Sequence, residues 1–242
     1  MADVLVVGSV ALDTVETPFG KREEILGGSA THFALSARHF AKVRLVGVIG
    51  KDFPPEHLKM LQKQEIDTSG LQPADGLTFR WHGRYSEDMN TRETLSVALN
   101  VYGQFNPEVP PAFQKIPYVL LGNSSPRVQR RILDQMKAPE FVLLDTMDLW
   151  IRTESEALED LLTRVHGVCI NDEEARLLAG KPNLSAATRE LLGRGIRVLI
   201  IQPGTIITSF RSSMLRLCQD GPYAELTDGV ERWRASSQRT EV

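Results

Sequence analysis

The sequence predicts a doubly wound α/β fold of three layers, with helices on both faces of a mostly parallel sheet and a small β-sheet lid beside it. Two observations predict the main domain: short apolar runs that suit strands covered on both faces, and amphipathic segments that alternate with them. A stretch of strict apolar–polar alternation predicts the lid. With 242 residues, 42% of them hydrophobic and 24% charged, the chain can bury the core of such a domain.

The predicted strands of the main sheet are rich in β-branched residues and are bounded by Gly or Asp. They are Val4–Val7, Val43–Ile49, Tyr118–Leu121, Phe141–Leu144, Gly167–Ile170 and Val198–Ile201. The predicted helices repeat apolar residues at helical spacing. They are Ser29–Phe40, Pro55–Gln64, Val128–Met136, Glu154–Arg164, Asp172–Ala179 and Ala186–Arg194. In a sheet of this kind, ligands bind at the carboxyl ends of the strands.

Residues 78–101 alternate with a period of two on either side of a polar turn at residues 86–92. In the first run, three aromatic residues and a glycine occupy one side and basic residues the other. These are Phe79, Trp81, Gly83 and Tyr85, against Arg80, His82 and Arg84. This period indicates antiparallel strands with one covered face. We expect residues 78–101 to form the lid together with residues 11–20.

Charge and hydropathy exclude several classes of function. The net charge of −3 and the pI of about 6.0 give no general basic field that would attract nucleic acid. The apolar runs are too short to cross a bilayer, and no secretory signal precedes the first strand, so we expect a cytoplasmic protein. Cys169 and Cys218 lie far apart and lack metal-ligand spacing. We interpret Cys169 as a small buried hydrophobe.

Three short motifs follow predicted strands. Gly27-Gly28 precedes a helix, where glycines allow close approach of a ligand to the backbone, although many helices simply begin after Gly. Gly47–Asp52 joins a strand to a helix and is either a ligand loop or a tight connection. Asp13 follows the first strand. Its carboxylate has the acceptors to bind two adjacent sugar hydroxyls, or it is a solvated loop residue.

Asn171 and Glu174 lie directly after another predicted strand and open a helix. Their spacing is that of a capping box, in which Asn171 caps the helix and Glu174 returns a hydrogen bond. The same pair can order water around Mg²⁺ bound to nucleotide phosphates, because Mg²⁺ usually keeps several waters. The two interpretations are compatible. The sequence has no Walker A, Gly-x-Gly-x-x-Gly, Gly-x-Ser-x-Gly or His-Glu-x-x-His motif.

The order of these motifs, over about residues 3–204, resembles the ribokinase-like (PfkB) family of carbohydrate kinases. The resemblance implies transfer of the γ-phosphoryl group of ATP, with Mg²⁺, to a sugar or nucleoside hydroxyl, and a lid through which a homodimer can form. It implies that Asp13 holds substrate hydroxyls and that Gly27 and Gly28 lie against the sugar. It implies that Asn171 and Glu174 support the nucleotide phosphates, with Glu174 reaching Mg²⁺ through water.

The chain departs from the family pattern at two places. His32 stands where many members carry a substrate-contacting Asn, and an imidazole can also donate one hydrogen bond. Family members also continue into a basic-x-Gly-x-x-Gly turn and a Gly-Ala-Gly-Asp segment with the catalytic aspartate. Here residues 202–205 are Gln-Pro-Gly-Thr, and no Gly-Ala-Gly-Asp follows; Asp220 and Asp228 lack the flanking glycines.

We therefore expect a kinase domain at residues 1–204, a divergent and weakly patterned tail at residues 205–242, and a C-terminally truncated or altered enzyme without a catalytic aspartate. Loss of a general base costs about 10²–10⁴-fold in rate, so activity should be weak or absent. The alternative is a non-catalytic sugar-binding or interaction protein that retains the kinase fold. A dinucleotide-dependent dehydrogenase is disfavoured, because Val4–Val10 lacks the glycine fingerprint.

Overall fold

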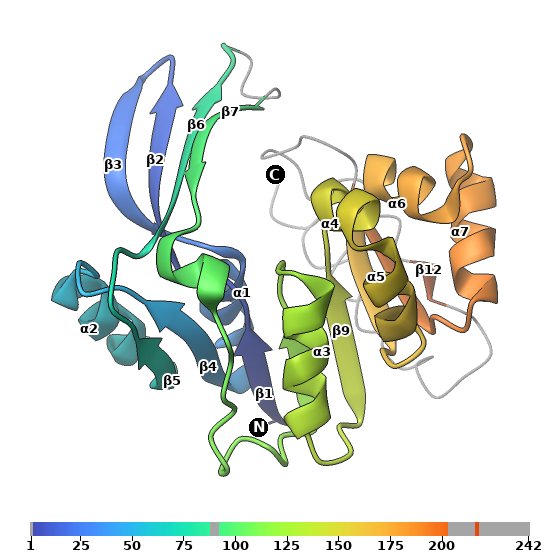
Figure 1. Cartoon of the computed structure of the whole chain (residues 1–242), viewed down its shortest axis with the longest axis horizontal. Coiled ribbons are helices and arrows are strands. Elements are labelled where there is room, and N and C mark those ends of the chain that lie inside the picture. The colour runs from blue at the N-terminus through green and yellow to red at the C-terminus, as the bar shows by residue number, and fades with distance from the viewer. Residues whose placement is uncertain (1, 88–91, 203–215, 218–242) are drawn as a thin grey trace, which may run out of the picture.

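The computed structural model describes residues 2–87, 92–202 and 216–217. In this part of the chain the main sheet has eight strands in the order β12-β11-β10-β9-β8-β1-β4-β5. Figure 1 shows this sheet with the lid strands β2, β3, β6 and β7 projecting beside it. The strands of the main sheet are β1 (Ala2–Val7), β4 (Ala41–Ile49), β5 (Asp67–Pro73), β8 (Tyr118–Leu121), β9 (Phe141–Asp145), β10 (Gly167–Asn171), β11 (Val198–Gln202) and β12 (Arg216–Leu217). Neighbouring strands are parallel except β11 and β12. The carboxyl ends of the parallel strands therefore meet at one edge, as the α/β fold requires.

The helices lie on both faces of this sheet, which confirms the predicted three-layer α/β fold. They are α1 (Ser29–Ala37), α2 (Pro55–Lys63), α3 (Pro126–Gln135), α4 (Asp148–Thr153), α5 (Ser155–Leu162), α6 (Asp172–Ala179) and α7 (Leu184–Gly193), with a 3₁₀ turn, η1, at Asn100–Gln104. Every predicted strand and helix of the main domain is present within a few residues. Strand β5 and helix α4 were not predicted. Strand β5 lies at the sheet edge with only Gly70 and Leu71 buried, so it lacks an apolar run.

Each face of the sheet has its own buried cluster. On one face Leu144 and Val168 pack with side chains of α3, α5, α6 and α7. On the other face Val6 and Leu45 pack with side chains of α1 and α2. Beyond β8 on this second face, apolar side chains of β9, β10 and β11 remain only partly buried among the described residues. They are Leu143, Cys169 and Ile200.

The lid is a four-stranded sheet in the order β3-β2-β6-β7. Its strands are β2 (Ala11–Thr17), β3 (Gly20–Gly27), β6 (Phe79–Tyr85) and β7 (Arg92–Ala98). The lid therefore extends through Gly27, beyond the predicted residues 11–20. The sequence did not predict β3, because this strand is exposed and has no alternation of buried and exposed residues. The predicted antiparallel pairing within residues 78–101 is confirmed, because β6 and β7 pair in antiparallel orientation. Two antiparallel hairpins lie side by side, so β2 and β6 pair in parallel.

The lid is attached to the main domain by a partly buried cluster of hydrogen bonds at Asp52. Its carboxylate accepts hydrogen bonds of 2.7 Å from both the amide and the hydroxyl of Thr78, and a third of 2.7 Å from Arg80. The Thr78 hydroxyl in turn accepts from the amide of Gly50 at 3.0 Å. The Gly47–Asp52 segment thus joins strand to helix and anchors the lid. This geometry favours the connection over a ligand loop.

The predicted tail at residues 205–242 lies outside the described residues apart from Arg216–Leu217, which form β12. Cys218, Asp220 and Asp228 belong to the part not described, so the predicted domain division stays a prediction. Within the described ranges, no helix combines the length and apolar character that crossing a membrane would need.

Candidate functional site

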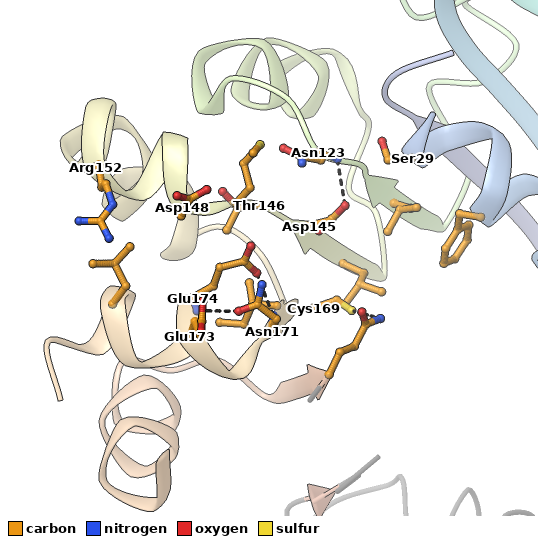
Figure 2. A pocket seen from close by; sticks show the side chains of 17 residues that line it. Ser29, Asn123, Asp145, Thr146, Asp148, Arg152, Cys169, Asn171, Glu173 and Glu174 are labelled. Carbon is orange, nitrogen blue, oxygen red and sulfur yellow. Dashed lines mark hydrogen bonds between the residues drawn. The ribbon is translucent and has the colours of Figure 1, made fainter. Parts of the chain in front are cut away.

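A cavity of about 610 Å³ opens at the carboxyl ends of β8, β9, β10 and β11. It runs from Ser29, at the start of α1, to Arg152 on α4 (Figure 2). Polar side chains from several elements line it: Asn123, Asp145, Thr146, Asp148, Asn171, Glu173, Glu174 and Gln202. This is where the α/β fold places ligand sites, and the lining is rich in carboxylate and amide groups.

Asp145 ends β9 and is largely buried in this cavity. Burial raises the pKa of its carboxyl to about 7, and the nearby Glu174 carboxylate adds to the increase, while hydrogen bonds from the Asn123 and Thr146 amides oppose it. The Asn123 amide donates to Oδ2 at 3.2 Å. A bound cation would relieve the repulsion between Asp145 and Glu174 and favour the ionised form.

Asn123 is fixed from both sides. The Trp150 indole donates to its Oδ1 at 2.9 Å, and the Tyr102 hydroxyl donates to its backbone carbonyl at 2.9 Å. Beneath this loop, the buried Gln129 amide donates to the Asp145 carbonyl at 2.8 Å and to the Gly122 carbonyl at 3.0 Å. These bonds hold the ends of β8 and β9 rigidly beside the cavity.

Asn171 and Glu174 form the predicted capping box at the start of α6. Asn171 Oδ1 accepts from the Glu174 amide at 2.8 Å, and Glu174 Oε2 accepts from the Asn171 amide at 2.8 Å. The structural interpretation is therefore confirmed. Both side chains also line the cavity and lie toward Asp145 (Figure 2). The cap fixes them in a position where Glu174 can serve a second purpose.

The Asp145 and Glu174 carboxylates suit a Mg²⁺ ion that the protein holds with only a few of its own ligands. Among the described residues, no group of three or more His, Cys, Asp or Glu side chains is arranged to hold a metal ion. Asp145 and Glu174 nevertheless face the same space and offer the oxygen ligands that Mg²⁺ prefers. Such a pair suits an ion that keeps most of its waters and is shared with substrate phosphates.

Asp13 on β2, Gly27 at the end of β3 and Gly28 at the start of α1 form a second cluster. Burial raises the pKa of Asp13 to about 6, and its Oδ1 has no hydrogen-bond partner among the residues that the structure describes. A Cβ at Gly27 would overlap the Asp13 carboxylate, and one at Gly28, whose φ is +99°, would overlap the Ser9 carbonyl. Glycine is therefore required at both positions. A buried carboxylate without a partner is costly, which is expected where a ligand supplies the missing donors.

The structure keeps the predicted site residues in two groups. Asn171 and Glu174 line the cavity, whereas Asp13, Gly27, Gly28 and His32 are not among its lining residues. Ser29 connects the groups, because it follows Gly28, lines the cavity and lies 3.2 Å from the Ser9 hydroxyl. His32 lies one turn further along α1 with its side chain exposed.

The comparisons with known proteins agree with this architecture. Residues 1–206 match the model of the pfkB family carbohydrate kinases. The chain belongs to the PfkB family. The cytidine kinase of Thermococcus kodakarensis is 29% identical over 209 residues, which are 84% of this chain and 74% of that protein.

Solved structures of two nucleoside kinases and a ribokinase share the fold at low sequence identity. The nucleoside kinase of Burkholderia thailandensis in complex with inosine has a TM-score of 0.70 and 17% identity, covering 91% of this chain and 78% of its own. The Methanocaldococcus jannaschii nucleoside kinase has a TM-score of 0.66 and 17% identity, with 90% and 77% covered. The ribokinase of Thermotoga maritima has a TM-score of 0.65 and 14% identity, with 92% and 80% covered.

As a PfkB kinase, the chain is by family a phosphotransferase that acts on a sugar or nucleoside hydroxyl. Sequence reasoning missed Asp145 and Asn123 as residues of its cavity. Asp145 directly follows an apolar run that was predicted as a strand, and that position was the available signal. Asn123 stands two residues after the predicted strand Tyr118–Leu121, so its position carried a weaker form of the same signal. Cys169, interpreted as buried, is half-buried and lines the cavity as a free thiol.

Proposed function

We propose that the substrate hydroxyls bind at Asp13 and that the substrate is a nucleoside or a related sugar. The single observation that carries the proposal is the buried Asp13 Oδ1, which lacks a partner among the described residues and lies against Gly27. Two adjacent hydroxyls of a ribose offer the donors that this carboxylate lacks. The likeness to a cytidine kinase supports a nucleoside in particular. His32 follows on α1 as a further contact to the substrate.

The second group of site residues, those that line the cavity, holds the phosphates of the nucleotide in this proposal. Asn171 and Glu174, fixed by their capping box at the start of α6, line the same cavity as Asp145, which ends β9. Mg²⁺ bound with ATP would neutralise charge on the transferred phosphoryl group. Glu174 would hold the ion through water, and the positive charge of a bound ion would favour the ionised form of Asp145. ATP and Mg²⁺ are thus the proposed co-substrate and cofactor.

We expect the rate of transfer by this chain to be low, because its sequence contains no Gly-Ala-Gly-Asp segment. In the family this segment carries the general base, and loss of a general base costs about 10²–10⁴-fold. The second candidate function, substrate binding without turnover, is favoured by the same fact together with an intact Asp13 cluster. A homodimer through the lid stays a prediction, which sedimentation of the full chain tests.

The deciding experiment measures binding and turnover on the same sample. Calorimetric titration with cytidine, inosine and ribose gives affinity, and a coupled assay of ADP release with ATP and Mg²⁺ gives turnover. Binding that disappears in Asp13→Ala supports the proposed substrate site, and the ADP release of the wild type separates a kinase from a binding protein. Binding that persists in Asp13→Ala would overturn the proposed site. ADP release at the rate of ordinary kinases, about 1–100 s⁻¹, would overturn the expectation of weak activity.

A further inference from the structure

One row of side chains crosses all four strands of the lid at the level of Asp13. The strand registers pair Ile25 with Asp13, Asp13 with Trp81, and Trp81 with Val97. Residues paired directly across neighbouring strands point to the same face of a sheet, so these four side chains share one face. The row therefore consists of one carboxylate flanked by apolar and aromatic side chains.

This row lies on the face of the lid that looks toward the cavity. Phe79 lies two residues before Trp81 on β6 and so shares its face. The Phe79 ring stacks on Tyr102 with ring centroids 5.4 Å apart, and the Tyr102 hydroxyl donates to the Asn123 carbonyl. Asn123 lines the cavity. The row thus extends the site from Asp13 across the lid.

The opposite face of the same strands is charged. His82 lies 3.0 Å from Glu16, and Arg84 donates to the same carboxylate at 2.9 Å. On the face that carries the row, by contrast, apolar side chains are partly exposed to solvent. Ile25 is 37% exposed and Val97 is 52% exposed. Apolar side chains left open beside a carboxylate oxygen that has no partner in the described ranges indicate a ligand with a polar end and an apolar end.

The Trp81 indole is fixed in an orientation in which a planar ligand can stack on it. Its Nε1 donates to Thr94 on β7 at 3.3 Å, and a Cβ at Gly83 would overlap its benzene ring. The ring therefore lies flat along β6 over Gly83, where a larger residue would push it away. A rigid indole costs little conformational entropy when a planar ligand stacks on it.

We propose that the row binds a nucleoside, with the ribose hydroxyls on Asp13 and the base against Trp81 and Val97, so that Trp81 is a specificity-determining residue. The inference rests on the function proposed above and names its substrate class. Neighbouring strands lie about 4.8 Å apart, so Trp81 is one spacing and Val97 two spacings from Asp13. A free pentose on Asp13 would leave the far part of the row unused. A base attached to that pentose extends over it.

The test compares cytidine with ribose in calorimetric titrations of the full chain and its variants. Base–aromatic stacking is worth about 1–3 kcal/mol per base, so Trp81→Leu should weaken cytidine binding about 5- to 150-fold and change ribose binding less than twofold. Trp81→Tyr keeps an aromatic face and should restore most of the affinity. Tyr85→Leu is the matched control, since Tyr85 lies on the same strand and face but further from Asp13. It should leave both affinities unchanged.

The outcomes separate this inference from the proposed function. Cytidine binding that depends on Asp13 but not on Trp81 overturns the nucleoside row and leaves the hydroxyl site intact. Equal affinity for ribose and cytidine in the wild type does the same. Failure of every sugar and nucleoside to bind overturns the proposed function itself. If Trp81→Leu unfolds, Trp81→Tyr together with Val97→Asp, which places a charge on the row, gives the same decision.

Discussion

Replacing Asp13 by asparagine should stabilise the protein at neutral pH while weakening the proposed substrate site. Burial raises the pKa of Asp13 from 3.8 to about 6, and no described group donates to its Oδ1. The folded protein therefore keeps a proton that the unfolded chain has released. The free energy of unfolding consequently falls as pH rises from about 4 to about 6, and the loss persists at higher pH.

The magnitude follows from the shift. About two pKa units correspond to about 3 kcal/mol, and because Asp13 is partly exposed, solvent screening reduces this to about 1–2 kcal/mol. The asparagine side chain carries no charge, so Asp13→Asn should raise the free energy of unfolding at about pH 8 by that amount and leave it nearly unchanged at about pH 4. Hydrogen bonds to a charged group are worth about 1.5–3 kcal/mol, so nucleoside affinity should fall about 10- to 150-fold.

Urea denaturation followed by circular dichroism at several pH values measures the first effect, and calorimetric titration measures the second. Asp75→Asn is the control, because Asp75 is exposed and pairs only with Lys51 at the surface among the described residues. It should change neither quantity appreciably. An Asp13→Asn protein with the pH slope of the wild type would refute the reasoning, because the carboxylate would then be as well solvated when folded as when unfolded.

Other changes test the two halves of the site and the lid. Asp145→Asn should raise the free energy of unfolding by up to about 4 kcal/mol at about pH 8, because burial raises the pKa of Asp145 to about 7 and the folded protein must hold the penalised charged form above that pH. Urea denaturation without metal measures this change. Added Mg²⁺ should stabilise the wild type more than the variant. Gly28→Ala should cost more than about 2 kcal/mol, because φ is +99° and the new Cβ would overlap the Ser9 carbonyl; urea denaturation measures the loss. Asp52→Ala leaves Thr78 without its acceptor and should cost about 1–3 kcal/mol while loosening the lid, which amide hydrogen exchange at residues 79–85 would show.

The main domain could be predicted from the sequence because its parallel strands are apolar on both faces. Val4–Val7 and Tyr118–Leu121 show this directly. Strand β3 could not be predicted, because exposed lid residues carry neither a run nor an alternation. The parallel pairing of β2 with β6 also depends on contacts between residues more than sixty positions apart. Local patterns do not encode such a contact.

The candidate site was predictable only in part, for a related reason. Asn171 and Glu174 are three residues apart, so their capping box is a local pattern that the sequence displays. Asp145 faces Glu174 only because β9 and β10 are neighbours in the sheet. The row through Asp13 and Trp81 likewise exists only through the lid registers. Side chains that meet across strands become functional groups through topology, which a single sequence does not reveal.

The two halves of the site depend on different parts of the chain, and this separates binding from transfer. Asp13, Gly27 and Gly28 need only β2, β3 and the start of α1, all within the described residues. The resemblance to carbohydrate kinases assigns the base that would accept the substrate proton to a Gly-Ala-Gly-Asp segment, a pattern that does not occur in this sequence. Hydroxyl binding through Asp13 therefore does not require that base. The proposed function therefore makes substrate affinity and turnover two separate measurements, because a change in one need not change the other.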